Sequence, residues 1–168
     1  MDNTIIRRCL NAAYRYLSYR ARSEAELWRY LHKCGFSDEV VAEAIVGLKE
    51  QSLIDDLAFA KFWRDSRLYS RPRSKRLIAR ELKEKKVAHE IIEQVTENID
   101  DEDNAYILGS RRMRTFAHLD YPEFQRGLSN YLAYRGFSYS VIRQTAGRLW
   151  QERHGEPDIV QIDGWHVR

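Results

Sequence analysis

The sequence predicts an all-α fold made of three tandem three-helix repeats that stack into an elongated, curved array. Two observations carry this prediction. Apolar residues recur at i, i+3, i+4 and i+7 in nearly every window, which is the helical period, and strand-like alternation is absent. The chain also repeats itself at a spacing of 51 and then 50 residues. A unit of this size cannot bury both faces of its helices alone, so stacking of neighbouring copies is expected.

The repeat is a gapless register of apolar positions around a short turn. Before the turn, the register aligns Leu27 with Ile78 and Leu128, and Leu31 with Leu82 and Leu132. After the turn it aligns Phe36, Val87 and Phe137; Val40, Ile91 and Val141; Val41, Ile92 and Ile142; and Leu48, Ile99 and Leu149. Each copy therefore has a helix with apolar residues at i and i+4, a turn, and a second helix with its own apolar face.

Capping residues predict the helices of the first repeat. A helix over about 4–20 precedes a second one that begins after Ser23, where Ser23 and Glu26 form a capping-box pattern. Gly35 suits the left-handed conformation that ends a helix, and Ser37 is the expected N-cap of the third helix.

The second and third repeats follow the same plan. We expect helices over 56–69 and 101–116, each followed by a helix whose N-cap is Ser74 or Asp120. The Asp120 helix has Pro122 in its first turn and a capping-box glutamate at Glu123, and Ser138 caps the last helix after Gly136. Lys86 stands where the other copies have glycine, so that turn carries a side-chain penalty or differs in geometry.

The register divides the chain into three repeats and a tail. The repeats span 1–54, 55–99 and 100–152. The tail, 153–168, contains Gly155, Pro157 and Gly164 and shows little periodicity.

A basic cluster over residues 71–86 is the strongest candidate site. It contains eight cations and two anions, although the net charge of the whole chain is only +3. Like charges four residues apart on a helix repel, and cations in a first helical turn oppose the macrodipole, so a bound polyanion would stabilise the segment. Alternatively, Glu81, Glu84 and a neighbouring acidic repeat neutralise it as surface ion pairs. The residues proposed to bind nucleic acid or a filament are Arg71, Arg73, Lys75, Arg76, Arg80, Lys83, Lys86, Arg20, Arg22, Arg111 and Arg112.

Other chemistries find little support in the sequence. It has no P-loop, GxGxxG or GxSxG pattern, so we expect a binding protein and not an enzyme. The acidic run 100–103 lacks the ligand spacing of a calcium loop and suits a helix N-terminus, and Cys9 and Cys34 lack the spacing of a zinc site or a disulfide framework. No cofactor or metal is expected. Without a membrane-spanning run or a signal-peptide pattern, the chain is expected to be soluble and cytoplasmic.

Several polar motifs, taken together, resemble the RecX regulators of the RecA recombinase. They are Leu17-x-x-Arg20-x-Arg22-Ser23-x-x-Glu26-Leu27-x3-Leu31-x3-Gly35-Phe36, then Leu53-Ile54-Asp55-Asp56-x-x-Phe59-Ala60, then Arg67 and Glu81-Leu82-x-x-Lys85. The resemblance spans residues 10–152. Two departures are Ser52 and Lys86, where the family usually has glycine.

The resemblance implies a regulator, mainly an inhibitor, that acts in DNA repair, recombination and the SOS response. Such a protein lies in the groove of the RecA filament on single-stranded DNA. There it restrains ATP hydrolysis, strand exchange and co-protease activity. The implied partners are the RecA filament and the DNA within it, with weak binding to bare DNA and no membrane contact.

Two other functions remain open. A three-helix unit with a basic helix also describes helix-turn-helix transcription factors, which bind duplex DNA tightly, sequence-specifically and with a steep salt dependence. A helical-repeat scaffold for peptides would show no dependence on DNA.

Overall fold

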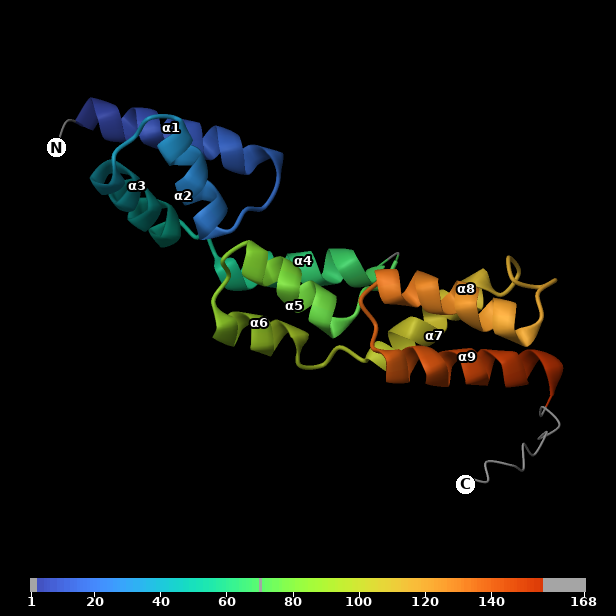
Figure 1. The fold of residues 1–168 in the computed structure, drawn as a ribbon. Coiled ribbons are helices and arrows are strands. Elements are labelled where there is room, and N and C mark those ends of the chain that lie inside the picture. The colour runs from blue at the N-terminus through green and yellow to red at the C-terminus, as the bar shows by residue number, and fades with distance from the viewer. Residues whose placement is uncertain (1–2, 70, 156–168) are drawn as a thin grey trace, which may run out of the picture. The chain divides into compact units, whose positions relative to one another are not determined.

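A computed structural model describes residues 3–69 and 71–155, and within these ranges the regular structure is entirely α-helical (Figure 1). The helices are α1 (Asn3–Tyr19), α2 (Glu24–Lys33), α3 (Asp38–Glu50), α4 (Asp56–Tyr69), α5 (Lys75–Glu84), α6 (His89–Thr96), α7 (Asp101–Arg112), α8 (Tyr121–Tyr134) and α9 (Tyr139–His154). The predicted all-α fold class and its three three-helix repeats are confirmed.

Each repeat packs its three helices around a core of its own, because each contributes apolar residues at helical spacing. The aligned positions lie in these cores: Leu27 and Leu31 in the first, Ile78 and Leu82 in the second, and Leu128 and Leu132 in the third.

The predicted N-caps are observed at most of the helix starts. Ser23 and Glu26 form a complete capping box at α2, and the Ser74 and Ser138 hydroxyls accept from the amides three residues on. At α8, the Asp120 carboxylate accepts from the Glu123 amide at 2.9 Å, which is the first half of the predicted box. Ser37 occupies the N-cap of α3 without a side-chain cap bond.

The turns between the second and third helices use the left-handed region in all three repeats. Gly35 has φ 87°, Gly136 has φ 88°, and Lys86 has φ 61°. Ser52, the other departure from the family pattern, also has a positive φ of 56°. At both positions a side chain therefore adopts the left-handed conformation, which glycine adopts at lower cost.

Helix α7 ends at Arg112, so the predicted helix over 101–116 is wrong at its C-terminal end. Residues 113–119 instead form a series of tight turns closed by i→i−3 bonds, such as that from the Phe116 amide to the Met113 carbonyl at 3.2 Å. This tightening places Phe116 against α8, where its ring packs edge-on to Phe124 and lies beside Gly127.

The last helix extends further than the predicted start of the tail at residue 153. Helix α9 continues to His154 and ends at Gly155, which has φ 76°. The rest of that segment, 156–168, lies outside the described residues.

The chain divides into two compact units, Met1–Asp100 with α1–α6 and Asp101–Arg168 with α7–α9. The curved stacking of all three repeats stays a prediction. None of the described helices combines the length and hydrophobicity needed to cross a lipid bilayer.

Candidate functional site

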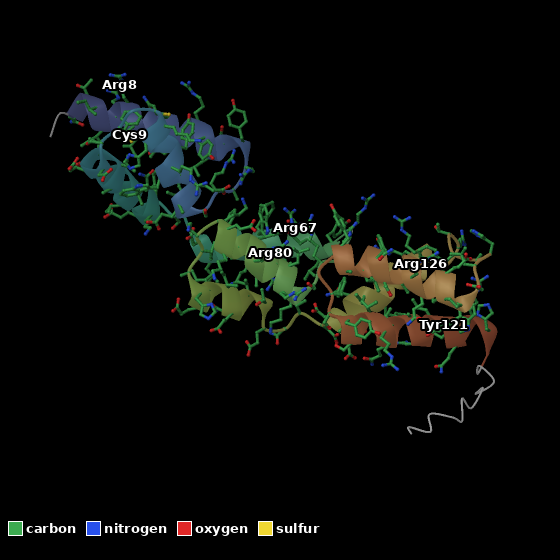
Figure 2. All side chains as sticks on the ribbon, viewed as in Figure 1. Arg8, Cys9, Arg67, Arg80, Tyr121 and Arg126 are labelled. Atoms are coloured by element: carbon green, nitrogen blue, oxygen red, sulfur yellow. The ribbon has the colours of Figure 1, made fainter. Side chains whose placement is uncertain are left out.

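Helix α5 turns its cations away from the core of the second repeat. Its buried face carries Ile78 and Leu82, and the buried Ser74 hydroxyl fixes its start by accepting from the Leu77 amide at 3.1 Å. Four of the predicted binding residues lie exposed on the remaining surface: Lys75, Arg76, Arg80 and Lys83. Figure 2 labels Arg80 on α5 and Arg67 on the neighbouring α4.

Glu81 is the acceptor for three donors within the second repeat. The Arg67 Nε and Trp63 Nε1 atoms both donate to Glu81 Oε2 at 2.8 Å, and Arg73 donates to Oε1. The Arg67 guanidinium also stacks 4.0 Å from the Trp63 ring centroid. Burial alone would raise the pKa of Glu81, but hydrogen bonds from Arg67, Trp63 and Arg73 lower it below its usual range. Arg73 is therefore part of an internal network.

Lys85 links the second repeat to the first. Its ammonium donates to Glu26 Oε1 at 2.9 Å, and its backbone carbonyl accepts from the Ser23 hydroxyl at 2.8 Å. The same ammonium lies 4.3 Å from the Trp63 ring centroid, and its side chain is only 19% exposed. A second link joins the Glu24 amide to Asp56 Oδ1 at 2.8 Å. Lys85 thus supports the packing of two repeats.

Glu26 collects cations from both sides of this junction. Arg20 donates to it through two nitrogens, at 2.8 and 3.2 Å, and Lys85 is the other cationic donor. Burial would raise the pKa of Glu26, but the hydrogen bonds from Arg20, Lys85 and the Ser23 amide lower it to about 2. Glu26 therefore stays ionised throughout the physiological range.

The other predicted binding residues fall into different environments. Arg20 is committed to Glu26, and Arg22 stacks 4.1 Å from the Tyr16 ring centroid with its Nε buried. Arg112 lies 4.7 Å from the Tyr131 ring centroid and is exposed, as are Arg111, Arg71 and Lys86. The structure thus gathers Lys75, Arg76, Arg80, Lys83 and Lys86 on α5 and its C-terminal turn. Arg111 and Arg112 lie in the other compact unit.

A groove of about 700 Å³ runs beside these cations. We call it the α5–α6 groove, and Lys75, Ala79, Arg80, Lys83, Val87, His89, Ile92, Glu93 and Thr96 line it. Aliphatic side chains meet polar and charged ones along it. The charge pattern of the sequence does not predict this groove, because its lining comes from two helices and the turn between them.

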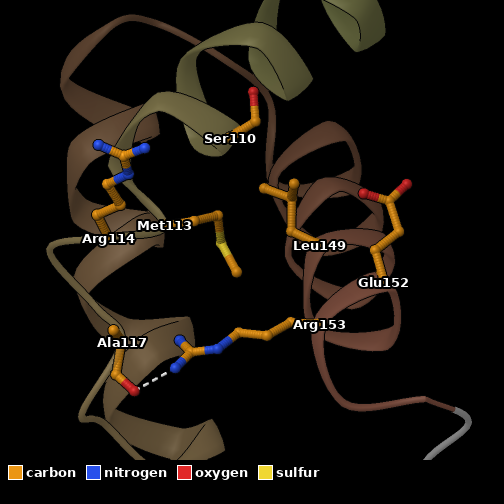
Figure 3. A pocket seen from close by; sticks show the side chains of 7 residues that line it. All are labelled: Ser110, Met113, Arg114, Ala117, Leu149, Glu152 and Arg153. Atoms are coloured by element: carbon orange, nitrogen blue, oxygen red, sulfur yellow. Dashed lines mark hydrogen bonds between the residues drawn. The ribbon is translucent and has the colours of Figure 1, made fainter.

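A second hollow, of about 350 Å³, lies in the third repeat (Figure 3). Met113 and Leu149 face each other across it, and Arg153 reaches over to donate to the carbonyl oxygens of Phe116 and Ala117. Because the Arg153 guanidinium is hydrogen-bonded to the turn that follows α7, we interpret this hollow as a packing feature of the third repeat.

Within the described part of the chain, no group of three or more His, Cys, Asp and Glu side chains is placed to hold a metal ion. Asp101, Glu102 and Asp103 lie in the first turn of α7, where acids complement the helix dipole. Cys9 is buried and its thiol pKa is raised by burial and by Cys34, whereas Cys34 is exposed.

Comparison with protein families gives three consecutive matches that follow the three repeats. Residues 9–47 match the first three-helix domain of RecX, residues 55–95 match the second, and residues 100–145 match the third. The chain belongs to the RecX family. Among the relatives, the regulatory protein RecX of Prosthecochloris aestuarii is 31% identical over 149 residues, covering 89% of this chain and 98% of the relative. The regulatory protein RecX of Chlorobium limicola is 33% identical over 139 residues, covering 83% and 87%.

Solved RecX structures share the fold. The crystal structure of RecX from Lactobacillus salivarius superposes with a TM-score of 0.76 at 23% identity, covering 87% of this chain and 97% of that one. A second crystal structure, of a regulatory protein RecX, gives a TM-score of 0.71 at 21% identity, covering 84% and 72%.

The polar residues that carry the RecX resemblance are mostly internal partners of one another. Arg20, Glu26 and Lys85 meet at the junction of the first two repeats, and Arg67 and Glu81 pair within the second. These residues therefore hold the helices in place. The exposed cations beside them take no part in these contacts.

Proposed function

We propose that this chain regulates the RecA recombinase, mainly as an inhibitor, by binding in the groove of the RecA filament on single-stranded DNA. Membership of the RecX family over three consecutive domains carries the proposal, since relatives of nearly the same length are named regulatory proteins. Its effects on ATP hydrolysis, strand exchange and co-protease activity would arise by contact and need no catalysis. The proposed setting is the cytoplasm.

The exposed face of α5 supports the proposal. Lys75, Arg76 and Lys83 project from one helix, and Lys86 follows it on the left-handed turn. Clustered cations attract an anionic partner, and the association then weakens as the salt concentration rises. Arg73 and Lys85 are held by Glu81 and Glu26, so these two cations support the face and do not contribute to its exposed charge.

The test is RecA ATPase activity on single-stranded DNA with this protein added at substoichiometric ratios. We expect inhibition to develop well below one molecule per RecA subunit. Substoichiometric inhibition is expected if each bound molecule affects a filament of many subunits. ATPase activity unchanged up to equimolar protein would contradict the proposal.

The alternative is a duplex-DNA-binding transcription factor, favoured by the three-helix repeat with a basic helix at its surface. It predicts tight, sequence-dependent binding to bare duplex DNA. The regulator predicts weak binding to bare DNA and strong binding once RecA and ATP are present. Anisotropy with labelled duplex and single-stranded oligonucleotides, with and without RecA, separates the two.

A further inference from the structure

The second repeat has small side chains at two positions where at least one other repeat has an aromatic ring. Ala79 corresponds to Trp28 of the first repeat, and Val87 corresponds to Phe36 and to Phe137 of the third. Those three rings pack in or against the cores of their own repeats. Ala79 and Val87 both line the α5–α6 groove. The smaller residues therefore open the space that larger side chains would fill.

The floor of the groove is aliphatic. It is formed by Ala79, Val87, Ile92 and Thr96, and the Thr96 hydroxyl donates to the Ile92 carbonyl at 2.8 Å. Since that hydroxyl is already satisfied by the backbone, the floor has little to offer a polar group. A volume of about 700 Å³ lies in the range of ligand-binding clefts, so the groove has room for a large apolar side chain together with the peptide backbone that carries it.

The rim of the groove is cationic along α5. Lys75, Arg80 and Lys83 line this side. Arg80 is paired with Glu84 at 3.8 Å, but both side chains are more than two-thirds exposed, so the pair is weak and can exchange for another carboxylate. On the α6 side, Glu93 lies 3.2 Å from His89. Anionic groups above the floor would therefore meet three cations on α5.

We propose that the α5–α6 groove binds an acidic protein segment that inserts one large apolar side chain onto the aliphatic floor while its carboxylates pair with Lys75, Arg80 and Lys83. The floor favours a protein over a nucleic acid, because bases bind by stacking on aromatic rings and the floor offers aliphatic carbon. This inference rests on the proposed function for the role of the α5 face and specifies what that face holds. The test uses no recombinase, so a failure of this inference can be told apart from a failure of the proposed function.

The test measures fluorescence anisotropy of a labelled nonapeptide, in which four acidic residues flank a central phenylalanine on each side, with the full chain. Two matched peptides replace the phenylalanine with alanine or the acids with their amides, and oligothymidylate is the nucleic-acid probe. We expect each matched peptide to bind at least about tenfold more weakly, because each lacks one half of the recognition. Val87→Phe and Ala79→Trp, which restore the rings of the other repeats, should reduce binding of the parent peptide to the level of the alanine peptide.

Ser129→Trp adds the same ring at the position of the third repeat that corresponds to Ala79, and it should leave peptide binding unchanged. Circular dichroism confirms that each variant folds. Equal binding of the phenylalanine and alanine peptides would overturn the proposal, because charge alone would then explain the affinity. Loss of oligothymidylate binding in the Val87→Phe protein, with peptide binding intact, would overturn it in favour of a nucleic-acid site.

Discussion

Two half-buried carboxylates organise the cations of the first two repeats. Glu26 accepts from Arg20 and Lys85, and Glu81 accepts from Arg67, Arg73 and the Trp63 indole. Both carboxyl groups have pKa values lowered against the effect of burial, so each is stabilised as an anion by its donors. The donors in turn depend on the anions, because a partly buried cation without a partner is costly.

Glu26→Gln should destabilise the chain by about 2 kcal/mol, since the amide keeps the shape of the side chain but removes the negative charge that strengthens three hydrogen bonds from Arg20 and Lys85. Urea unfolding of the full chain, followed by far-UV circular dichroism, measures the change. Glu152→Gln is the matched control, because Glu152 pairs with Arg148 at an exposed site, where solvent screens the pair, and should change stability much less. Equal effects of the two substitutions would contradict the prediction.

The stability contributed by Glu26 should disappear in acid. Its folded pKa of about 2 lies below the unfolded value of about 4.3, so the contribution is present above pH 5 and is lost as the pH falls toward 2. The lowered pKa of Glu81 makes stability fall with acid in the same way. Burial raises the pKa of Asp56, so Asp56 contributes the opposite dependence of stability on pH.

Comparing the wild type with Glu26→Gln isolates the contribution of Glu26 to this acid dependence. The difference between their urea midpoints should be largest at pH 6 and should shrink by pH 3. A difference that does not change between these pH values would show that Glu26 titrates normally.

At the scale of elements, the helices follow closely from the sequence because their determinants are local. The repeat register predicts that Ile78 and Leu82 face the core, and both are buried. Gly35 and Gly136 predict left-handed turns, and both residues have a positive φ. The end of α7 was missed because its last turns tighten to bring Phe116 against α8, a tertiary contact that helical periodicity does not encode.

Lys86→Gly should stabilise the chain by about 1 kcal/mol, because glycine adopts the left-handed conformation of this turn without a Cβ penalty. Thermal unfolding monitored by circular dichroism measures the shift. Lys83→Gly is the matched control, since Lys83 lies in the last turn of α5 with ordinary helical geometry and glycine should destabilise it. A lower melting temperature for Lys86→Gly would show that the lysine side chain makes a contact worth more than the strain.

The candidate site was only partly predictable, because ion pairs depend on residues far apart in the sequence. Counting charges grouped Arg73 and Lys85 with exposed neighbours, but Lys85 meets a glutamate 59 positions away. One signal was available: position 81 is acidic amid cations, whereas the register places Tyr30 and Tyr131 there in the other repeats. An acid among cations, at a position that is aromatic in the other repeats, indicates an ion-pair partner for those cations.

At the scale of the whole molecule, the exposed cations of α5 should control association with the RecA filament. The triple variant Arg76→Glu, Lys83→Glu and Lys86→Glu changes cations that are exposed and lie outside the Glu81 and Glu26 networks. We expect at least a tenfold loss of affinity for RecA filaments on single-stranded DNA, with helical content retained. Co-sedimentation with filaments and circular dichroism measure the two quantities.

The matched control reverses three exposed cations elsewhere, Lys33, Lys61 and Arg126, and so makes the same change in net charge. If both triple variants lose affinity equally, total charge governs binding and the α5 face has no special role. Retained affinity in the α5 variant would assign those cations to solvation of the surface.

A residue of the second repeat also caps the start of α2 in the first repeat. The amide of Glu24, in the first turn of α2, donates to the carboxylate of Asp56, which begins the next repeat. A fragment cut after residue 54 would therefore expose an amide that the intact chain keeps bonded, besides losing Lys85 as the partner of Glu26. A second repeat exchanged into this chain would therefore keep both contacts only if it brought an acid and a lysine at these two places.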